Sequence, residues 1–399
     1  MKSIKTLFKI GHGPSSSHTM GPGFASERVK KMYPNHSFRV TLYNSLALTG
    51  EGHLTNEVIK NILKDVSFKA TLDPNRHPNF LIFEVFKDNE KIDEIEVVSL
   101  GGGDISFNNE TLEGKNIYPH KSFDEIRNYC QKNNVSLVDY IKKYDTNDLF
   151  PYLETVYDQM IKTIKTGIKQ KGLLPGELKV ARKAHKLYES ALKQEDVNLR
   201  HRTLLSTYAF SVSEENAAGG IVVTAPTCGA SGILPAVLYY ADNIDKFERK
   251  KIINALAVAG LFGNIIRRNA TISGAVGGCQ AEVGSACSMA AAAYAYLQGE
   301  SIEQIEYAAE IAMEHHLGLT CDPVMGYVQI PCIERNAVAA LRAINASELA
   351  LILFETRKIS FDMIVKTMYE TGLDMDPKYK ETSKAGMATI YKELEKKAL

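Results

Sequence analysis

Three cysteines constrain the fold of this chain more than any other feature of its sequence. They are Cys279, Cys321 and Cys332, which lie 42 and then 11 positions apart. Each is found in a loop marked by glycine or proline, next to a stretch that reads as the beginning of a helix. A thiol at a helix N-terminus feels the positive end of the helix dipole, which lowers its pKa and favours the thiolate. The fold is therefore expected to bring three thiolates to one point.

Three converging thiolates have a definite use in metal chemistry. Thiolates bind soft metals and iron–sulfur clusters, and three of them are one short of holding all four irons of a [4Fe-4S] cluster. The fourth iron is then free to act as a Lewis acid on a substrate oxygen. A structural zinc site would favour close cysteine pairs such as C-x2-C, which the sequence lacks. Spacing alone leaves the kind of metal site open, a non-catalytic metal-binding or amino-acid-sensing protein included.

The other cysteines and the charge balance narrow the class of protein. Cys130 and Cys287 are expected to be buried core residues, whereas Cys228 supplies an extra thiol that could approach the site. Residues 1–10 are too short and too charged for a signal peptide, so we expect a cytoplasmic protein without disulfides. Lys+Arg and Asp+Glu both number 47. This balance argues against a nucleic-acid partner or an anionic membrane surface.

One uncharged stretch, residues 217–240, is long enough to cross a membrane. Two prolines and four glycines interrupt it, so we expect a buried loop followed by the start of a helix. No membrane partner is therefore expected.

The secondary-structure signals change character along the chain. Residues 1–112 alternate helix and strand patterns, which predicts a small α+β domain with its helices on one face of the sheet. Its expected helices are 24–32 and 56–66, the second capped by Thr55 or Asn56; its expected strands are 38–48, 68–72, 80–86 and 95–100, and glycines 101–103 form a turn. A polar linker, 113–120, follows.

Residues 121–399 read as a larger all-α domain. Its predicted helices are 123–133, 136–143, 151–170, 178–192, 197–216, 236–242, 245–264, 281–297, 302–316, 335–355 and 361–371. The small-residue run ACSMAAAAY at 286–294 predicts a helix packed tightly among its neighbours.

Residues 15–19, SSSHT, gather hydroxyls, an imidazole and the N–H groups of a helix start. Such a stretch suits a carboxylate, because unpaired N–H donors and the helix dipole both favour an anion. The alternative is an elaborate helix N-cap. His18 and His53 are the candidates for proton transfer, because imidazole titrates near neutral pH. A purely structural loop histidine is the alternative for His53.

Several motifs together resemble the iron–sulfur-dependent L-serine dehydratases, in the form that fuses a small and a large domain in one chain. They are GPSSSHTMGP (13–22), SLALTGEGH (45–53), SLGGG (99–103), ENAAGG (215–220), APT (225–227) through Pro235, the three cysteine motifs, and KYKET (378–382). The resemblance covers nearly the whole chain.

The resemblance implies a small domain joined to an all-helical catalytic domain, and a homodimer. It implies a [4Fe-4S] cluster on Cys279, Cys321 and Cys332, conversion of L-serine to pyruvate and ammonia, and docking of the Ser/His loop over the cluster. Pyridoxal phosphate is not required, because the cluster activates the hydroxyl and a positioned base removes the Cα proton.

Roles follow for residues near these motifs. The catalytic candidates are Ser15, Ser16, Ser17, His18 and His53, and the candidates for contact with substrate are Thr19, Thr227 and Ser231. Groups beside cluster ligands orient them or donate hydrogen bonds to sulfur, which is the expected role of Gln280, Glu282, Asp322, Glu334, Arg335 and Asn336. For Glu282 and Glu334, an interaction with the helix dipole is the alternative.

Two departures from the family pattern stand out. The chain ends EKKAL, without the terminal cysteine that caps the open iron in some members, and Cys228 replaces a frequent asparagine. Within the same chemistry, β-elimination from L-threonine or L-cysteine is the alternative activity.

Overall fold

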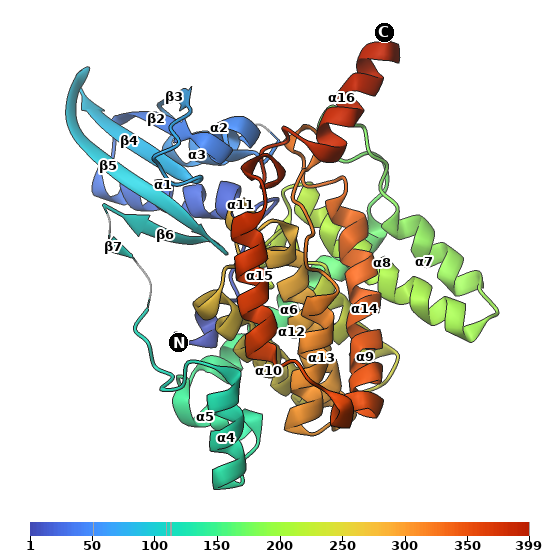
Figure 1. Cartoon of the computed structure of the whole chain (residues 1–399). Helices are drawn as coiled ribbons and strands as arrows, with labels where there is room; N and C mark the ends of the chain where they lie inside the picture. The colour runs from blue at the N-terminus through green and yellow to red at the C-terminus, as the bar shows by residue number, and fades with distance from the viewer. Residues whose placement is uncertain (51, 109, 112–113, 399) are drawn as a thin grey trace.

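The computed structural model describes residues 1–50, 52–108, 110–111 and 114–398 (Figure 1). Glu51 of the SLALTGEGH motif, Leu112 and Glu113 at the expected boundary, and Leu399 lie outside the described residues. Residues 114–120 form neither helix nor strand, as expected of a linker.

The N-terminal region contains a mixed six-stranded sheet of order β3-β2-β4-β5-β6-β7. Its strands are β2 (Ser37–Tyr43), β3 (Val66–Thr71), β4 (Phe80–Lys87), β5 (Glu90–Gly101), β6 (Asp104–Phe107) and β7 (Glu110–Thr111). Alternation along β2 buries Phe38, Val40 and Leu42. These side chains share one core with α1 (Gly21–Met32) and α3 (Thr55–Leu63). The predicted α+β class is confirmed.

Two local predictions in this region are wrong. The strand expected over 38–48 ends at Tyr43, and α2 (Asn44–Thr49) follows. Asn44 has a φ of 49° and its side chain bonds the backbone of Asp73, so it turns the chain where periodicity alone continued the strand. The expected cap of α3 is also wrong, because Leu54 precedes that helix and makes no side-chain cap.

From residue 121 onward the described chain is largely helical, as predicted. The helices are α4 (Phe123–Asn133), α5 (Leu137–Tyr144), α6 (Leu149–Lys169), α7 (Ala184–Lys193), α8 (Val197–Ala217), α9 (Ile233–Asn243), α10 (Arg249–Asn269), α11 (Gly274–Gly277), α12 (Ser285–Gln298), α13 (Ile302–Glu314), α14 (Cys332–Leu353), α15 (Phe361–Asp374) and α16 (Gly386–Ala398). The alanine-rich α12 is almost entirely buried, and α9, α10, α13 and α14 pack around it. Small side chains allow this close approach, which confirms the prediction for residues 286–294.

Some helix limits differ from the predicted ones. Helix α7 starts at Ala184 rather than at 178, because Leu173 and Ala181 form an isolated bridge across the preceding turn. Helix α10 begins four residues later than predicted, and α16 was not predicted. In Figure 1, α16 projects from the rest of the molecule.

The first residues of the chain join the helical layer rather than the sheet. Ile4, Leu7 and Phe8 are fully or almost fully buried in the helical core. The short strand β1 (Ile10–His12) then pairs antiparallel with β8 (Ile221–Val223). The chain therefore enters the Ser/His stretch from a point fixed in the helical layer.

The uncharged stretch 217–240 folds as β8, turns and most of α9, in agreement with the expected buried loop and helix start. Within the described residues, one helical segment, Cys332–Thr356, has the length and composition of a membrane span. It packs against α8, α12 and α13, and 39% of its most apolar window is buried, so it serves as a core helix with an exposed side.

Candidate functional site

The three predicted cysteines converge on one pocket. Cys279, Cys321 and Cys332 line it together with Gly229 and Glu282. The described cysteines are all free thiols. The fold thus brings together side chains from loops that are far apart in the sequence.

Two of the three cysteines lie at helix starts, as predicted. Cys279 immediately precedes the π-helical turn Gln280–Gly284 that continues into α12, and Cys332 is the first residue of α14. For Cys321 the prediction is wrong. This residue lies on an extended segment, where its N–H donates to Tyr379 O (2.8 Å) and its carbonyl accepts from Glu381 N (2.7 Å). Pairing with a distant segment holds Cys321 extended, and only a short 3-10 turn, Val324–Gly326, follows it before α14 among the described residues.

The thiols differ in their electrostatic environment. A hydrogen bond from Cys321 and the charge of Arg335 lower the pKa of Cys279 to about 6, against the effect of burial. Burial and the neighbouring Cys279 raise the pKa of Cys332. Arg335 is held in place because its guanidinium donates to Thr320 O (2.6 Å). One basic side chain therefore favours a thiolate at this pocket.

The Ser/His stretch forms a buried π-helical turn, Ser16–Met20, directly before α1. Ser15 caps it, because its Oγ accepts from His18 N (3.0 Å). The N-cap considered for this stretch is therefore present. Ser17 Oγ lies 2.9 Å from His18 Nδ1, and Ser16 is buried beside it.

Both nitrogens of His18 have protein partners. Besides Ser17 at Nδ1, Nε2 lies 2.9 Å from Ser45 Oγ, and that hydroxyl donates to the backbone oxygen of Glu381 (2.8 Å). The ring is fully buried, and burial followed by repulsion from His53 lowers the pKa of His18. His18 thus lies at the centre of a hydrogen-bond network.

His53, unlike His18, lines the cysteine pocket. Its ring centroid is 4.5 Å from that of His18, and it lines the cysteine pocket with Ser15. Within the described part of the chain, His53 Nδ1 has no hydrogen-bond partner. Burial lowers the pKa of His53 to about 4, so the ring is neutral at pH 7. Its backbone oxygen accepts from Thr19 Oγ1 (2.6 Å), which shows Thr19 holding His53.

Two carboxyl groups complete the pocket, and one of them was not singled out from the sequence. Glu381 Oε2 lies 3.8 Å from His18 Nδ1, and the ligand atoms of Glu282, Cys321 and Glu381 lie within 4.8 Å of one another. Burial, then the charge of Cys279, raises the pKa of Glu381 to about 8. Burial, then Glu381, raises that of Glu282. The sequence signal for Glu381 is its place in KYKET, a motif whose residue types alone assign it no role.

Several predicted neighbours of the cysteines hold backbone. Gln280 Oε1 accepts from Gly318 N (2.9 Å) and its Nε2 donates to Met368 O (3.1 Å). Asn336 Oδ1 accepts from Gly232 N (2.9 Å), and its amide donates to Gly229 O (2.8 Å). Gln280 thus fixes the loop that leads to Cys321, and Asn336 ties the loop of Gly229, which lines the pocket, to α14.

The remaining candidates lie in varied positions. Asp322 Oδ2 accepts from Met387 N (2.8 Å) near the start of α16. Glu334 is exposed and pairs with Lys183 (2.6 Å), so it points away from the thiols. Thr227 lies close enough to Glu282 to lower its pKa. The buried Ser231 hydroxyl has no partner among the described residues.

The other cysteines do not line this pocket. Cys130 and Cys287 are buried in the helical core, as predicted, where each thiol faces a backbone oxygen. Cys228 Sγ lies 3.9 Å from Met20 Sδ, at the end of the Ser/His turn. The extra thiol therefore lies beside that turn.

The family models and the individual relatives that match this chain agree with one another. The family model for the serine dehydratase beta chain matches residues 3–63, and that for the serine dehydratase alpha chain matches residues 57–388. L-serine dehydratase 2 of Escherichia coli is 38% identical over 97% of this chain and 98% of that protein. The L-serine dehydratases of Haemophilus influenzae and Helicobacter pylori J99 are equally similar, over 97% and 98% of this chain and 99% of each relative.

The burial of His53 predicts a specific pH dependence of stability. Its pKa is lower in the folded chain than the ordinary 6.5, so the unfolded chain takes up this proton first as the pH falls. Stability should decline as the pH falls from about 6.5 to about 4. Between pH 7 and 4.5 the wild type should lose about 2–3 kcal/mol more unfolding free energy than His53→Gln. Denaturant titrations measure the difference; His36→Gln, outside the pocket, is the control, and equal losses in wild type and His53→Gln would contradict the prediction.

Proposed function

The chain belongs to the iron–sulfur L-serine dehydratase family, with the alpha-chain and beta-chain regions in one polypeptide, and on this premise we propose that it converts L-serine to pyruvate and ammonia. The observation that carries the proposal is the convergence of three free cysteines with Ser15 and His53 in one buried pocket. The relatives act on L-serine by name, and the pocket offers three thiols as candidate metal ligands and His53 as a candidate proton acceptor for such an elimination.

Members of this family depend on an iron–sulfur cluster and not on pyridoxal phosphate. We propose Cys279, Cys321 and Cys332 as the ligands of a [4Fe-4S] cluster. The donor set fits, because three thiols from three separate elements face one pocket and Arg335 offsets part of their charge. When bound, such a cluster supplies an open iron that polarises the substrate hydroxyl as a Lewis acid.

We propose His53 as the base that takes the Cα proton. It is neutral at pH 7, it lines the pocket, and its Nδ1 has no partner among the described residues. Both nitrogens of His18 are occupied by serine hydroxyls, which suits a role in positioning the Ser/His turn. A positioned base contributes about 10²–10⁴-fold to the rate.

We propose that the start of the Ser/His turn receives the substrate carboxylate. Ser15 lines the pocket beside His53, and its hydroxyl lies at the N-terminal end of the turn, where the helix dipole favours an anion. Ser16, Ser17, Thr227 and Ser231 are the further hydroxyls of this region. Removal of the Cα proton and loss of the β-hydroxyl leave an aminoacrylate, which tautomerises to an imine and hydrolyses to pyruvate and ammonia.

The two hydrophobic cores suggest how the chain divides into domains. We propose a small domain over 1–112 and a catalytic domain over 121–399, with the first residues of the small domain inserted into the core of the large one. A cytoplasmic location is proposed because the described thiols are free, which is typical of a reducing compartment.

The cysteine assignment makes a direct prediction. Cys279→Ala, Cys321→Ala or Cys332→Ala should each abolish the brown colour of anaerobically purified protein, its acid-labile sulfide and its release of pyruvate from L-serine. Cys130→Ala should keep all three, because this thiol lies in the helical core and does not line the cysteine pocket. Iron and sulfide analysis with a coupled pyruvate assay measures this. Full turnover in any of the first three variants would defeat the assignment. Sulfide release from L-cysteine or ketobutyrate from L-threonine, faster than pyruvate from L-serine, would favour the alternative β-eliminations.

The two histidines should separate chemistry from architecture. His53→Gln should retain the iron and sulfide content and lose about 10²–10⁴-fold in kcat, since it removes the proton acceptor. His18→Gln should also retain the metal, with a smaller loss in kcat and a higher KM, because it loosens the Ser/His turn. Steady-state kinetics and metal analysis measure both. A loss in kcat for His18→Gln larger than that for His53→Gln would reverse the two roles.

We propose that the chain forms a homodimer through the C-terminal end of α14. This end exposes Ile352 (74% exposed), Leu351 and Leu353. Adjacent apolar groups of this size favour a protein partner, and the zero net charge leaves no strong repulsion between two copies.

Ile352→Glu should convert the dimer to a monomer, because it places a charge in the apolar interface. Leu72→Glu, on an exposed residue of the small domain, should leave the mass unchanged. Multi-angle light scattering during gel filtration measures the mass. A monomeric wild type, or an Ile352→Glu variant with the mass of a dimer, would contradict the proposal.

A further inference from the structure

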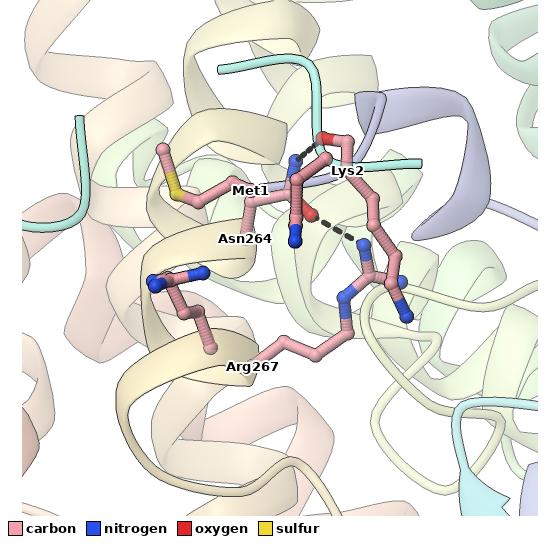
Figure 2. A pocket seen from close by; sticks show the side chains of 6 residues that line it. Met1, Lys2, Asn264 and Arg267 are labelled. Carbon is pink, nitrogen blue, oxygen red and sulfur yellow. Dashed lines mark hydrogen bonds between the residues drawn. The ribbon is translucent and has the colours of Figure 1, made fainter. Parts of the chain in front are cut away.

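A second cavity, separate from the cysteine pocket, lies where three parts of the chain meet. It has a volume of about 270 Å³ and is lined by Met1, Lys2, Asn116, Asn264, Arg267 and Arg268. Figure 2 shows the labelled side chains of the N-terminal segment and of α10 gathered around it. None of these residues lines the proposed serine site.

One of its cations is held in a fixed orientation. The Arg267 guanidinium donates to Thr6 Oγ1 (2.8 Å) and to Asn264 Oδ1 (2.7 Å). Asn264 in turn donates to Lys2 O (3.0 Å), so the two segments are tied together at the cavity wall. The arginine is thus placed in advance of any ligand, which lowers the entropy cost of binding.

The described residues that line the cavity carry several basic groups. Burial and then repulsion from Arg267 lower the pKa of Lys2 to about 8. Burial and then repulsion from Arg268 and Arg267 lower that of the Met1 amino group. The described residues that line the cavity include no carboxylate. Asp104, whose charge acts on Lys2 in the opposite direction, also pairs with Lys9 and Arg267.

The helix dipole does not explain this arrangement by itself. Arg267 and Arg268 lie in the last turn of α10, where cations are favoured. The Met1 amino group, however, comes from a different segment and approaches the same arginines despite the repulsion. A bound anion would remove that repulsion.

We propose that this cavity binds a phosphate group, either as inorganic phosphate or carried by a small phosphomonoester. A cluster of several cations binds a doubly charged phosphate better than it binds a singly charged carboxylate. The planar guanidinium group can also donate two parallel hydrogen bonds to two phosphate oxygens. The volume is below the range typical of drug-sized ligands, which restricts the ligand to a small one.

A ligand in this cavity would connect two segments of the chain that lead to the proposed serine site. Lys2 begins the segment that leads to the Ser/His turn, and the chain runs from Arg268 through α11 to Cys279. Phosphate between these segments binds the folded chain and not the unfolded one. Binding should therefore raise the melting temperature in proportion to the logarithm of phosphate concentration once the site is filled.

The test uses the full-length protein, purified anaerobically, with calorimetric titration and thermal unfolding as readouts that do not need activity. Inorganic phosphate and glycerol 3-phosphate should each raise the melting temperature, whereas potassium chloride at equal ionic strength should not. The probe that binds with the higher affinity shows whether the site takes free phosphate or a phosphomonoester. Arg268→Ala should weaken phosphate binding by about tenfold or more, because it removes a guanidinium that lines the cavity. Arg268 is exposed, and no hydrogen bond or ion pair is seen for it among the described residues, so its charge is available to the ligand.

Arg202→Ala, on the surface of α8, is the matched control and should bind phosphate like the wild type. Arg268→Lys should bind with intermediate affinity, and it keeps the test usable if the alanine variant does not fold. The proposal is overturned if chloride reproduces the shift, if Arg268→Ala and Arg268→Lys both bind like the wild type, or if Arg202→Ala loses as much affinity as Arg268→Ala.

Discussion

The site depends on the attachment of the first residues of the chain to the helical core. Burial of Ile4, Leu7 and Phe8 and the pairing of β1 with β8 fix the chain up to His12. Asn216 Nδ2 then donates to Pro14 O (2.8 Å), immediately before the Ser/His turn. Burial of each apolar side chain of this size contributes about 1.5–3 kcal/mol to the free energy of unfolding. The first twelve residues, the N-terminal arm, are therefore held firmly against the helical core. The turn therefore reaches the cysteines from a rigid base.

A second consequence of the same packing is the exclusion of water from ionisable groups. His18 and His53 are neutral at pH 7 because burial disfavours their charged forms, and Glu381 tends to hold its proton for the same reason. Cys279 is the exception, because Arg335 and a hydrogen bond from Cys321 outweigh its burial. At one pH the pocket therefore holds a neutral His53, which suits the proposed proton acceptor, and a Cys279 thiolate, which suits the proposed metal ligand.

Local sequence patterns predict much of this arrangement. The features that they do not predict depend on contacts between segments that are distant in the sequence. Local patterns predict the fold class, most helices and the cysteines, because periodicity and glycine or proline turns act over a few residues. They miss the bridge between Cys321 and Lys380, and with it Glu381, because this pairing joins segments about sixty residues apart. They also place Glu334 near the thiols, whereas its partner Lys183 draws it outward. Contacts between distant segments are the information that composition and spacing do not carry.

Sequence families and structural layers divide the chain at different points. The two family models meet at residues 57–63, inside α3, while the change from sheet to helices occurs near residues 114–120. The beta-chain model thus covers the arm, the Ser/His turn and His53. The alpha-chain model carries the cysteines and most of the sheet. Because the arm is packed into the helical core, fusion of the two regions in one chain holds the proposed base beside the proposed ligands without the entropy cost of association between separate subunits.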